Sequence, residues 1–347
     1  MVLPTTYVSA LLLLVLAFLC LGLWPNTFKR AGSQWRFELF YFDFAVGAIL
    51  FAVIAAFTFG TFGSEMAFDD RMLVAGRSAQ VWVVAAGFLF NLGNMLFVAA
   101  MSLLGLSAAL PLSVGLALIV ASLSNFRAGN VVFLISGIVL LLVSLVLDGM
   151  ACRLRDLGIP TAVKGAPKPI PKPAPKAKTR RTAKGILLAL LSGIPLGLFY
   201  PLFSKGEAGD FGLGPYAGML LFCVGVIIAT IIFNFYFMNI AIEGGALPFN
   251  AYFRGRASQH FLGFAGGAIW AAGALAAAIA SSVPSGVGLS ATLRVVVPLA
   301  SALLALLSGL WIWKEFPAKS KNARLCIGVT AVIFGCGLAL AGTGLAR

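Results

Sequence analysis

The sequence predicts an all-α polytopic membrane protein with ten transmembrane helices. Of its 347 residues, 61% are hydrophobic and only 10% are charged, whereas soluble domains carry about 25% charged residues. The mean hydropathy of +1.01 is typical of a helix bundle surrounded by lipid. A soluble fold of this composition would expose apolar surface over most of its area. The composition therefore excludes a soluble enzyme, a nucleic-acid-binding protein and a disulfide-stabilised scaffold.

Ten apolar runs are separated by short polar segments, and each is close to or longer than the roughly 20 residues that a transmembrane helix needs. They fall at residues 3–24, 37–60, 79–104, 107–124, 129–150, 184–204, 216–239, 259–282, 288–313 and 322–343. The shortest run, 107–124, is near the lower limit for a span. We therefore expect five helices on each side of a central polar segment.

The central segment, residues 151–183, differs from the rest of the chain. Its prolines at 160, 167, 169, 171, 173 and 175 are interleaved with lysines. Closely spaced prolines favour an extended polyproline II spacer without a core. We predict a first five-helix unit at 1–150, a Pro/Lys-rich cytoplasmic linker at 151–183 and a second five-helix unit at 184–347. The linker lysines could also contact anionic lipid, with solvated topology signals as the default interpretation.

Basic residues predict the orientation in the membrane. The net charge is +14, and a cytoplasmic linker places 19 lysines and arginines inside against five outside. With five helices in each half, both termini then lie outside. We expect a multi-pass protein of the plasma membrane, in a bacterium the inner membrane.

The two halves share a weak internal repeat. Short matches recur in the same order with offsets that drift only from 175 to 183. The matched pairs are Gly22/Gly197, Gly47/Gly225, Gly87/Gly267, Phe90/Trp270, Gly93/Gly273 and Gly105/Gly288. An odd number of helices per unit turns the second copy upside down in the membrane. Inverted repeats of this kind form many secondary transporters, whose substrate site lies near the midplane between the repeats.

Several sequence stretches, in order along most of the chain, resemble one transporter family. They are Leu21–Pro25, Lys29-Arg30, Asp43, Thr58–Gly60, Gly93-Asn94, Gly105–Ser107, Pro201–Phe203, 261–267 and Trp313–Phe316. These stretches resemble the ureide permeases of plants, in the drug/metabolite transporter superfamily. The resemblance implies ten helices as two inverted five-helix repeats, and transport of ureides such as allantoin, of uracil and of oxidised purines.

We expect a bacterial-type member of the family, related to the bacterial rhamnose and ribose/glucose porters of the superfamily, which have similar glycine-rich helices and keep a sugar substrate open. Its linker departs from the plant proteins, which are reported to carry a P-loop-like motif there. The sequence contains no G-x-x-x-x-G-K-[S/T], so nucleotide binding has no support.

Asp43 is the candidate proton-coupling residue. It lies about six residues into the span 37–60, and ionisable groups inside spans are costly enough to suggest function. A carboxylate in a low-dielectric setting can take up and release a proton near neutral pH. The alternative is an interfacial carboxylate paired with Lys29, Arg30 or Arg36.

Four residues are candidates for substrate binding: Asn91, Asn94, Trp270 and Arg294. The two asparagines are three positions apart, hence on one helix face, and their amides could both donate to and accept from a heterocycle. Trp270 could stack on a planar ring, and Arg294 offers five donors. The alternatives are interhelical hydrogen bonds for the asparagines, core packing for Trp270, and an Arg294 side chain that reaches the outer interface.

Pro111 and Pro298 occupy the fourth span of each half, and each removes a backbone hydrogen bond. Helices interrupted at corresponding positions indicate the binding region of a transporter. No metal-binding or nucleophilic motif is present, so we expect no enzyme activity, no catalytic residues, no metal and no cofactor.

The sequence therefore predicts a secondary active transporter, a proton-coupled symporter or a facilitative porter, that moves a small polar heterocycle by alternating access. A monosaccharide porter of the same superfamily is the first alternative. The second is a membrane receptor or scaffold that binds its ligand without moving it. The expected partners are the small-molecule substrate, the lipid bilayer and a proton as coupling ion, with no nucleic acid.

Overall fold

The computed structural model describes residues 1–124, 126, 130–157, 175–209, 212–316 and 320–346. Ten helical segments in it are long and apolar enough to cross a membrane, which confirms the predicted all-α polytopic fold. The spans are α1 (Tyr7–Leu23) continued by α2 (Pro25–Ala31), α3 (Phe37–Phe57), α5 (Gly76–Leu104), α6 (Leu106–Ser124), α7 (Val131–Leu157), α8 (Pro175–Glu207), α9 (Gly214–Asn239), α10 (Ala257–Ser281), α11 (Ala291–Trp311) and α12 (Lys321–Leu345).

Short elements that the hydropathy pattern did not predict join some of these spans. They are α4 (Phe68–Val74), η1 (Phe249–Arg254) and η2 (Ser285–Val287). The first span is divided at Pro25, which begins α2 because a proline has no N–H to donate to the preceding turn. The chain leaves α2 at Gly32, whose φ of 89° favours glycine.

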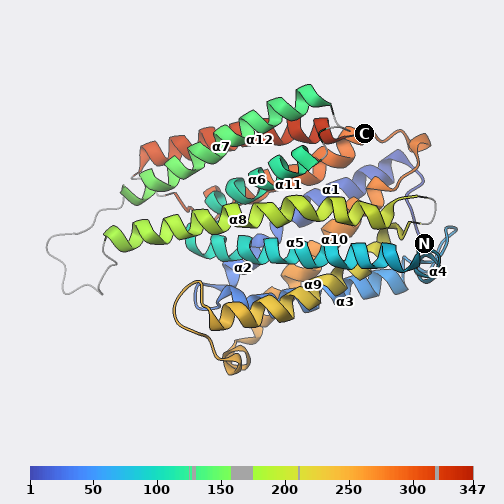
Figure 1. The fold of residues 1–347 in the computed structure, drawn as a ribbon, viewed down its shortest axis with the longest axis horizontal. Coiled ribbons are helices and arrows are strands. Elements are labelled where there is room, and N and C mark those ends of the chain that lie inside the picture. Colours follow the sequence, from blue (N-terminus) through green and yellow to red (C-terminus); the bar gives the residue numbers. More distant parts are fainter. Residues whose placement is uncertain (125, 127–129, 158–174, 210–211, 317–319, 347) are drawn as a thin grey trace.

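Two spans extend into the predicted linker. Helix α7 continues to Leu157 and α8 begins at Pro175, so both ends of the segment 151–183 are helical. Its middle, 158–174, lies outside the described residues, as do the lysines at 164, 168 and 172 for which we expected lipid contact. We call the end of the bundle where α7 ends and α8 begins the linker-side end; both termini lie at the opposite end (Figure 1).

Helices of the two halves pack against one another throughout the bundle, from α7 and α12 at one side to α3 and α9 at the other (Figure 1). Between these sides, α6 packs on α8 and α11, and α1 packs on α11. Helix α5 packs on α8 and α9, and α10 packs in the same way on α1 and α3. Helices of the two halves are therefore interleaved through the whole bundle rather than forming two separate domains.

Glycines allow the closest of these helix contacts. A Cβ atom at Gly47 of α3 would lie 2.0 Å from the Phe264 carbonyl oxygen of α10, and one at Gly225 of α9 would lie 2.1 Å from the Val84 carbonyl oxygen of α5. Gly267 lies against α3 in the same manner. Small residues that bring backbones together are the usual basis of helix packing in lipid.

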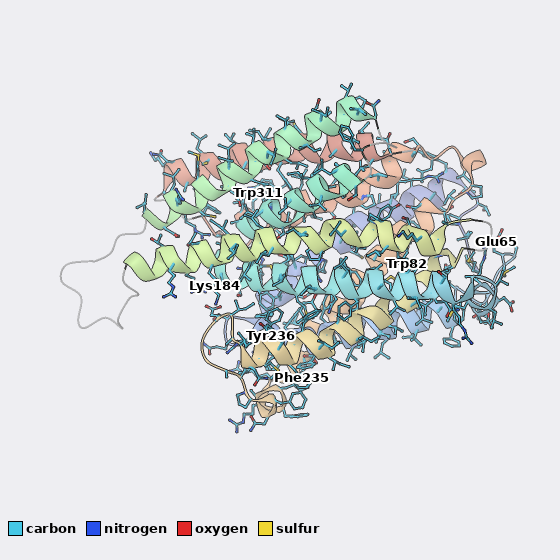
Figure 2. The ribbon with its side chains drawn as sticks, in the orientation of Figure 1. Glu65, Trp82, Lys184, Phe235, Tyr236 and Trp311 are labelled. Carbon is cyan, nitrogen blue, oxygen red and sulfur yellow. The ribbon has the colours of Figure 1, made fainter. Side chains whose placement is uncertain are left out.

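Exposed aromatic side chains occur toward both ends of the long axis. Trp82 lies toward the end that holds the termini, while Tyr236 and Trp311 lie toward the linker-side end (Figure 2). Trp311 is 72% exposed. Aromatic rings are enriched at the two membrane–water interfaces, so their positions fit a bundle whose long axis crosses the bilayer.

Candidate functional site: a central aromatic cluster and a buried carboxylate

Six aromatic side chains meet in the middle of the bundle, one from each of six spans. This central aromatic cluster consists of Trp24, Phe44, Phe90, Phe199, Phe222 and Trp270. Its centre is a stacked pair, Phe90 and Trp270, whose ring centroids are 4.9 Å apart with planes 23° from parallel. The predicted substrate residue Trp270 is only 5% exposed, so in this conformation its ring packs on protein.

The cluster members come in pairs at similar spacings along the chain. Trp24 and Phe199 are 175 positions apart, Phe44 and Phe222 are 178 apart, and Phe90 and Trp270 are 180 apart. These spacings fall within the offsets of the glycine matches between the two halves. The cluster therefore contains three residue pairs at the spacings of the predicted internal repeat.

Two polar side chains lie beside the cluster without hydrogen-bond partners other than each other in the part of the chain that the structure describes. Tyr41 of α3 packs on Phe44 at 5.1 Å, and its hydroxyl lies near the Asn94 side chain of α5. Among the described residues, neither the Tyr41 hydroxyl nor Asn94 Nδ2 has a partner with full hydrogen-bond geometry, although the two side chains lie close enough to interact with each other. Because buried polar groups nearly always find partners, these atoms are suited to hold a polar ligand.

Asn91 differs from Asn94, although both lie on α5. Its Nδ2 donates to Thr230 Oγ1 at 2.9 Å and to the Val226 carbonyl at 3.2 Å, both on α9. Asn91 thus makes the interhelical hydrogen bonds that the alternative interpretation expected. Its Oδ1 has no partner among the described residues. Asn94 is the better placed of the two for a ligand.

Asp43 lies at the linker-side end of the α3–α10 contact, in a polar group formed by three elements. The Tyr252 hydroxyl of η1 lies 2.5 Å from Asp43 Oδ1, and His260 Nδ1 of α10 lies 3.0 Å from Asp43 Oδ2. The rings of Tyr252 and His260 pack edge to face at 4.7 Å. The Trp35 ring packs against His260 at 4.9 Å.

This group is compact because α10 carries no side chain where it meets Asp43. A Cβ at Gly263, one turn beyond His260, would lie 2.6 Å from Asp43 Cβ. Burial and the Asp43 carboxylate raise the pKa of Tyr252 well above its usual range. Tyr252 therefore stays protonated at physiological pH and donates to the carboxylate.

From the sequence, the alternative for Asp43 was an ion pair with Lys29, Arg30 or Arg36. The structure shows a different partner. Lys29 Nζ instead lies 2.7 Å from Glu315 Oε1, and Arg36 is held by Glu38. The ionisable partner of Asp43 in the described structure is His260, which is 217 positions away in the sequence.

Arg294 is not brought to the central cluster. Its guanidinium donates to the backbone carbonyls of Ser281, Val283 and Leu289 and so ties the α10–α11 connection to the start of α11. Ser281 is eleven residues beyond Trp270 on α10, which is roughly 16 Å along the helix. In this conformation the arginine neither reaches the substrate candidates nor approaches Asp43.

Pro111 and Pro298 lie within α6 and α11, and neither helix is interrupted at them. The break beside the cluster is instead the one between α1 and α2, at Trp24 and Pro25. Pro111 is fully enclosed by protein, as a proline in a transmembrane helix requires where a carbonyl is freed. Pro298 is partly exposed.

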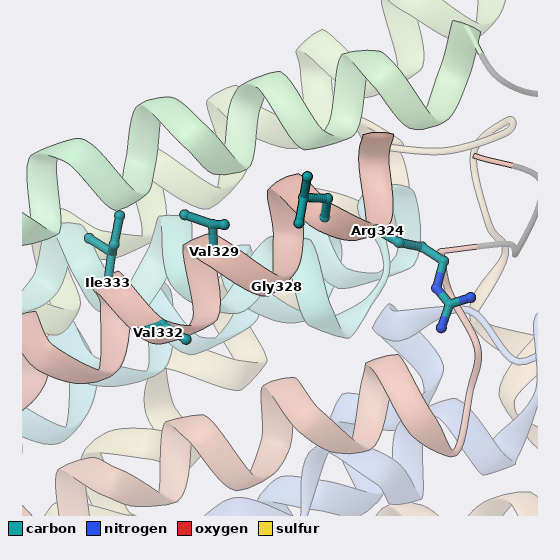
Figure 3. Close-up of a pocket in the computed structure, with 6 residues that line it drawn as sticks. Arg324, Gly328, Val329, Val332 and Ile333 are labelled. Carbon is teal, nitrogen blue, oxygen red and sulfur yellow. The ribbon is translucent and has the colours of Figure 1, made fainter. Parts of the chain in front are cut away.

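A depression of about 360 Å³ on the outer face of α12 is a poor candidate for a substrate site (Figure 3). It is lined by Arg324, Leu325, Gly328, Val329, Val332 and Ile333. Leu325 is 70% exposed and Val332 is 67% exposed. An apolar face of this kind on a span suits contact with lipid chains.

Sequence reasoning missed Tyr41, Tyr252 and His260. Tyr41 is one aromatic residue among many in an apolar run, and Tyr252 lies between two spans. Only His260 carried a usable signal, because it is the single histidine of the chain. The contacts of these three residues with Asn94 or Asp43 could not be predicted from the sequence, because they depend on how α3 packs on α5 and α10.

Comparisons with known proteins give limited further information. No protein family model matches the chain. Ureide permease 2 of Arabidopsis thaliana is 28% identical over 124 residues, which cover 34% of this chain and 31% of that protein; the match thus spans about a third of the relative's length. A solved structure described only as a crystal structure of a protein aligns over 94% of this chain and 96% of its own, with a TM-score of 0.47 and 16% identity.

Proposed function

We propose that this protein is a secondary transporter that carries an uncharged, planar polar solute, such as a ureide, uracil or an oxidised purine, by alternating access. The observation that carries the proposal is the Tyr41–Asn94 pair, whose buried polar atoms have no hydrogen-bond partner among the described residues other than each other and lie beside the central aromatic cluster. The partial similarity to a plant ureide permease supports the same class of solute.

The chemistry of the central region favours an uncharged solute. Tyr41, Asn91, Asn94 and Thr230 supply hydroxyl and amide groups, which donate and accept hydrogen bonds without formal charge. Aromatic rings beside these groups suit the faces of a flat heterocycle. A sugar would need a denser set of hydrogen-bonding groups than this mostly aromatic cluster offers.

We propose that Asp43 and His260 bind the coupling proton. The two residues join α3 of the first half to α10 of the second half. The same helix pair carries the contact of Phe44 with Trp270, at 5.8 Å, in the central cluster. A change of protonation would alter the attraction between Asp43 and His260, and with it the α3–α10 packing that encloses the solute.

We also propose that the two halves of the chain are inverted repeats. This arrangement is supported by the contacts that interleave helices of the two halves and by the regular sequence spacing of the cluster residues. In alternating access the two repeats would exchange conformations, so that the central site opens to one end of the bundle and then to the other. The cytoplasmic side is assigned to the linker-side end by the positive-inside rule alone.

The experiment is uptake into proteoliposomes with and without an imposed pH gradient. The panel is uracil, allantoin, xanthine, rhamnose, ribose and glucose. Gradient-stimulated uptake of a heterocycle would support the proposal, whereas uptake of a sugar alone would move the protein to the porter alternative. If the folded protein binds a panel solute but moves none, it is a receptor.

A further inference from the structure

A second pocket, of about 270 Å³, lies at the linker-side end of the bundle and is separate from the central cluster. Its wall combines residues of both halves, among them Phe28, Trp35 and Phe37 of the first half and Glu243 and Trp313 of the second, together with Arg181. The aromatic wall residues can pack against a flat ring. The volume exceeds that of a single small heterocycle.

The cations of this pocket already have partners. The pairs are Lys29 with Glu315 at 2.7 Å, Arg36 with Glu38 at 2.5 Å and Arg181 with Glu243 at 2.7 Å. An ionic ligand would have to compete with these carboxylates, whereas an uncharged ligand can bind without breaking any pair. Arg36 uses three of its five N–H groups on Glu38 and the Gly245 carbonyl, which leaves two for a ligand.

The wall of the pocket continues toward the central cluster on two helices, α5 and α3. Met101 of the wall is followed one turn deeper by Phe97, and Asn94 lies three residues beyond Phe97 on the same face of α5. Similarly, Phe37 leads to Tyr41 on α3. The pocket is therefore aligned with the polar pair that the proposed function assigns to the solute.

An aromatic contact lies between the pocket and the central cluster. Trp24 and Phe97 pack edge to face with centroids 6.2 Å apart, and each is about 5% exposed. Trp24 also packs on Phe44 of the central cluster at 5.2 Å. Trp24 stands at the junction of α1 and α2, where Pro25 interrupts the helix, so its ring can shift without moving the whole span.

We infer that the linker-side pocket is a second binding station for the transported solute, an uncharged planar molecule with hydrogen-bonding edges, and that the Trp24–Phe97 contact separates it from the Tyr41–Asn94 site. This inference rests on the proposed function. The solute would occupy the pocket on its way between the linker-side solution and the central site. Two molecules can then be bound to one chain at the same time.

Binding stoichiometry tests the inference. The probe is tritiated uracil, or labelled allantoin where that solute has the higher uptake, measured by equilibrium binding to the purified full-length protein. We expect two molecules per chain for the wild type. Ser102→Trp fills the pocket from α5 and Ser33→Trp fills it from the α2–α3 connection; each should reduce the stoichiometry to one.

Two further variants complete the test. Asn94→Ala should also reduce the stoichiometry to one, by loss of the other station. Ser124→Trp is the matched control, because Ser124 is exposed at the far end of α6, and it should keep two. If the wild type transports solute but binds one molecule per chain, the second binding site is excluded and the proposed function stands. The second site is also excluded if both Ser102→Trp and Ser33→Trp still bind two molecules. A folded wild-type protein that takes up no panel solute would contradict both the second site and the proposed function.

Discussion

His260 Nδ1 lies 3.0 Å from the Asp43 carboxylate, so the single histidine of the chain is paired with the carboxylate that the sequence marked for proton coupling. The pair joins α3 to α10, which also meet through Phe44 and Trp270 in the central cluster. A protonation event at one end of this helix contact is therefore connected by packed side chains to the place where we propose that the solute binds.

Replacement of Asp43 by Asn tests the coupling. An amide at this position keeps the shape of the side chain and can still accept from Tyr252, but it does not ionise. We expect Asp43→Asn to abolish the stimulation of uptake by a pH gradient while solute exchange at equal pH continues. Uptake with and without the gradient provides the measurement. A variant that still responds to the gradient would exclude Asp43 as the coupling residue.

Tyr252→Phe should shift the pH dependence of uptake without abolishing coupling. Its hydroxyl donates to Asp43, and a hydrogen bond to a charged group contributes about 1.5–3 kcal/mol. Loss of this donor changes the balance between the protonated and the ionised carboxylate. We expect the pH midpoint of uptake to move by about one to two units, since one unit corresponds to about 1.4 kcal/mol. Tyr236→Phe, at an exposed tyrosine of α9, is the control, and an equal shift there would contradict the assignment.

Glu315→Gln should destabilise the fold. The Glu315 carboxylate accepts from the backbone N–H groups of Leu106 and Ser107 at the start of α6 and also pairs with Lys29. We expect a loss of about 1–3 kcal/mol, measured by thermal unfolding of the purified protein. Glu243→Gln is a suitable comparison because its side chain is 43% exposed, and exposed ion pairs contribute about 0–1 kcal/mol. Equal effects of the two substitutions would argue against the capping role.

Gly267→Ala tests the close packing of α10 on α3. The added Cβ would lie 1.8 Å from the Phe44 carbonyl oxygen, so the helices would have to separate. We expect a loss of at least about 1–3 kcal/mol and less folded protein on size-exclusion chromatography. Gly149→Ala is the matched control, since no atom lies within 4 Å of its added Cβ, and alanine at a helix position should be neutral or stabilising. A folded, stable Gly267→Ala protein would show that the α3–α10 spacing is not tight.

The spans could be predicted from the sequence because hydropathy and length decide them locally. The run 37–60 corresponds to Phe37–Phe57, and the shortest run, 107–124, corresponds to Leu106–Ser124. The partners of the functional residues could not be predicted in this way. His260 meets Asp43 from 217 positions away, and Glu315 meets Ser107 from 208, because tertiary packing alone brings them together.

Arg294 shows the opposite difficulty. A charged residue inside an apolar run suggested a ligand contact, and the side chain instead donates to three carbonyls of the α10–α11 connection. Backbone carbonyls in such a connection give no sequence signal. Asn94 was singled out for its amide, whereas its neighbour Tyr41 was hidden among the 29 phenylalanines and other aromatic residues of the chain.

The central claim is that the solute binds between Tyr41, Asn94 and the aromatic cluster. Its most direct test is the initial rate of panel-solute uptake into proteoliposomes by the wild type and by Asn94→Ala, each with and without a pH gradient. We predict gradient-stimulated uptake of an uncharged heterocycle by the wild type, and a reduction of about tenfold or more in Asn94→Ala, which corresponds to one lost hydrogen bond. No uptake by the folded wild type, or equal uptake by the two proteins, would contradict the account.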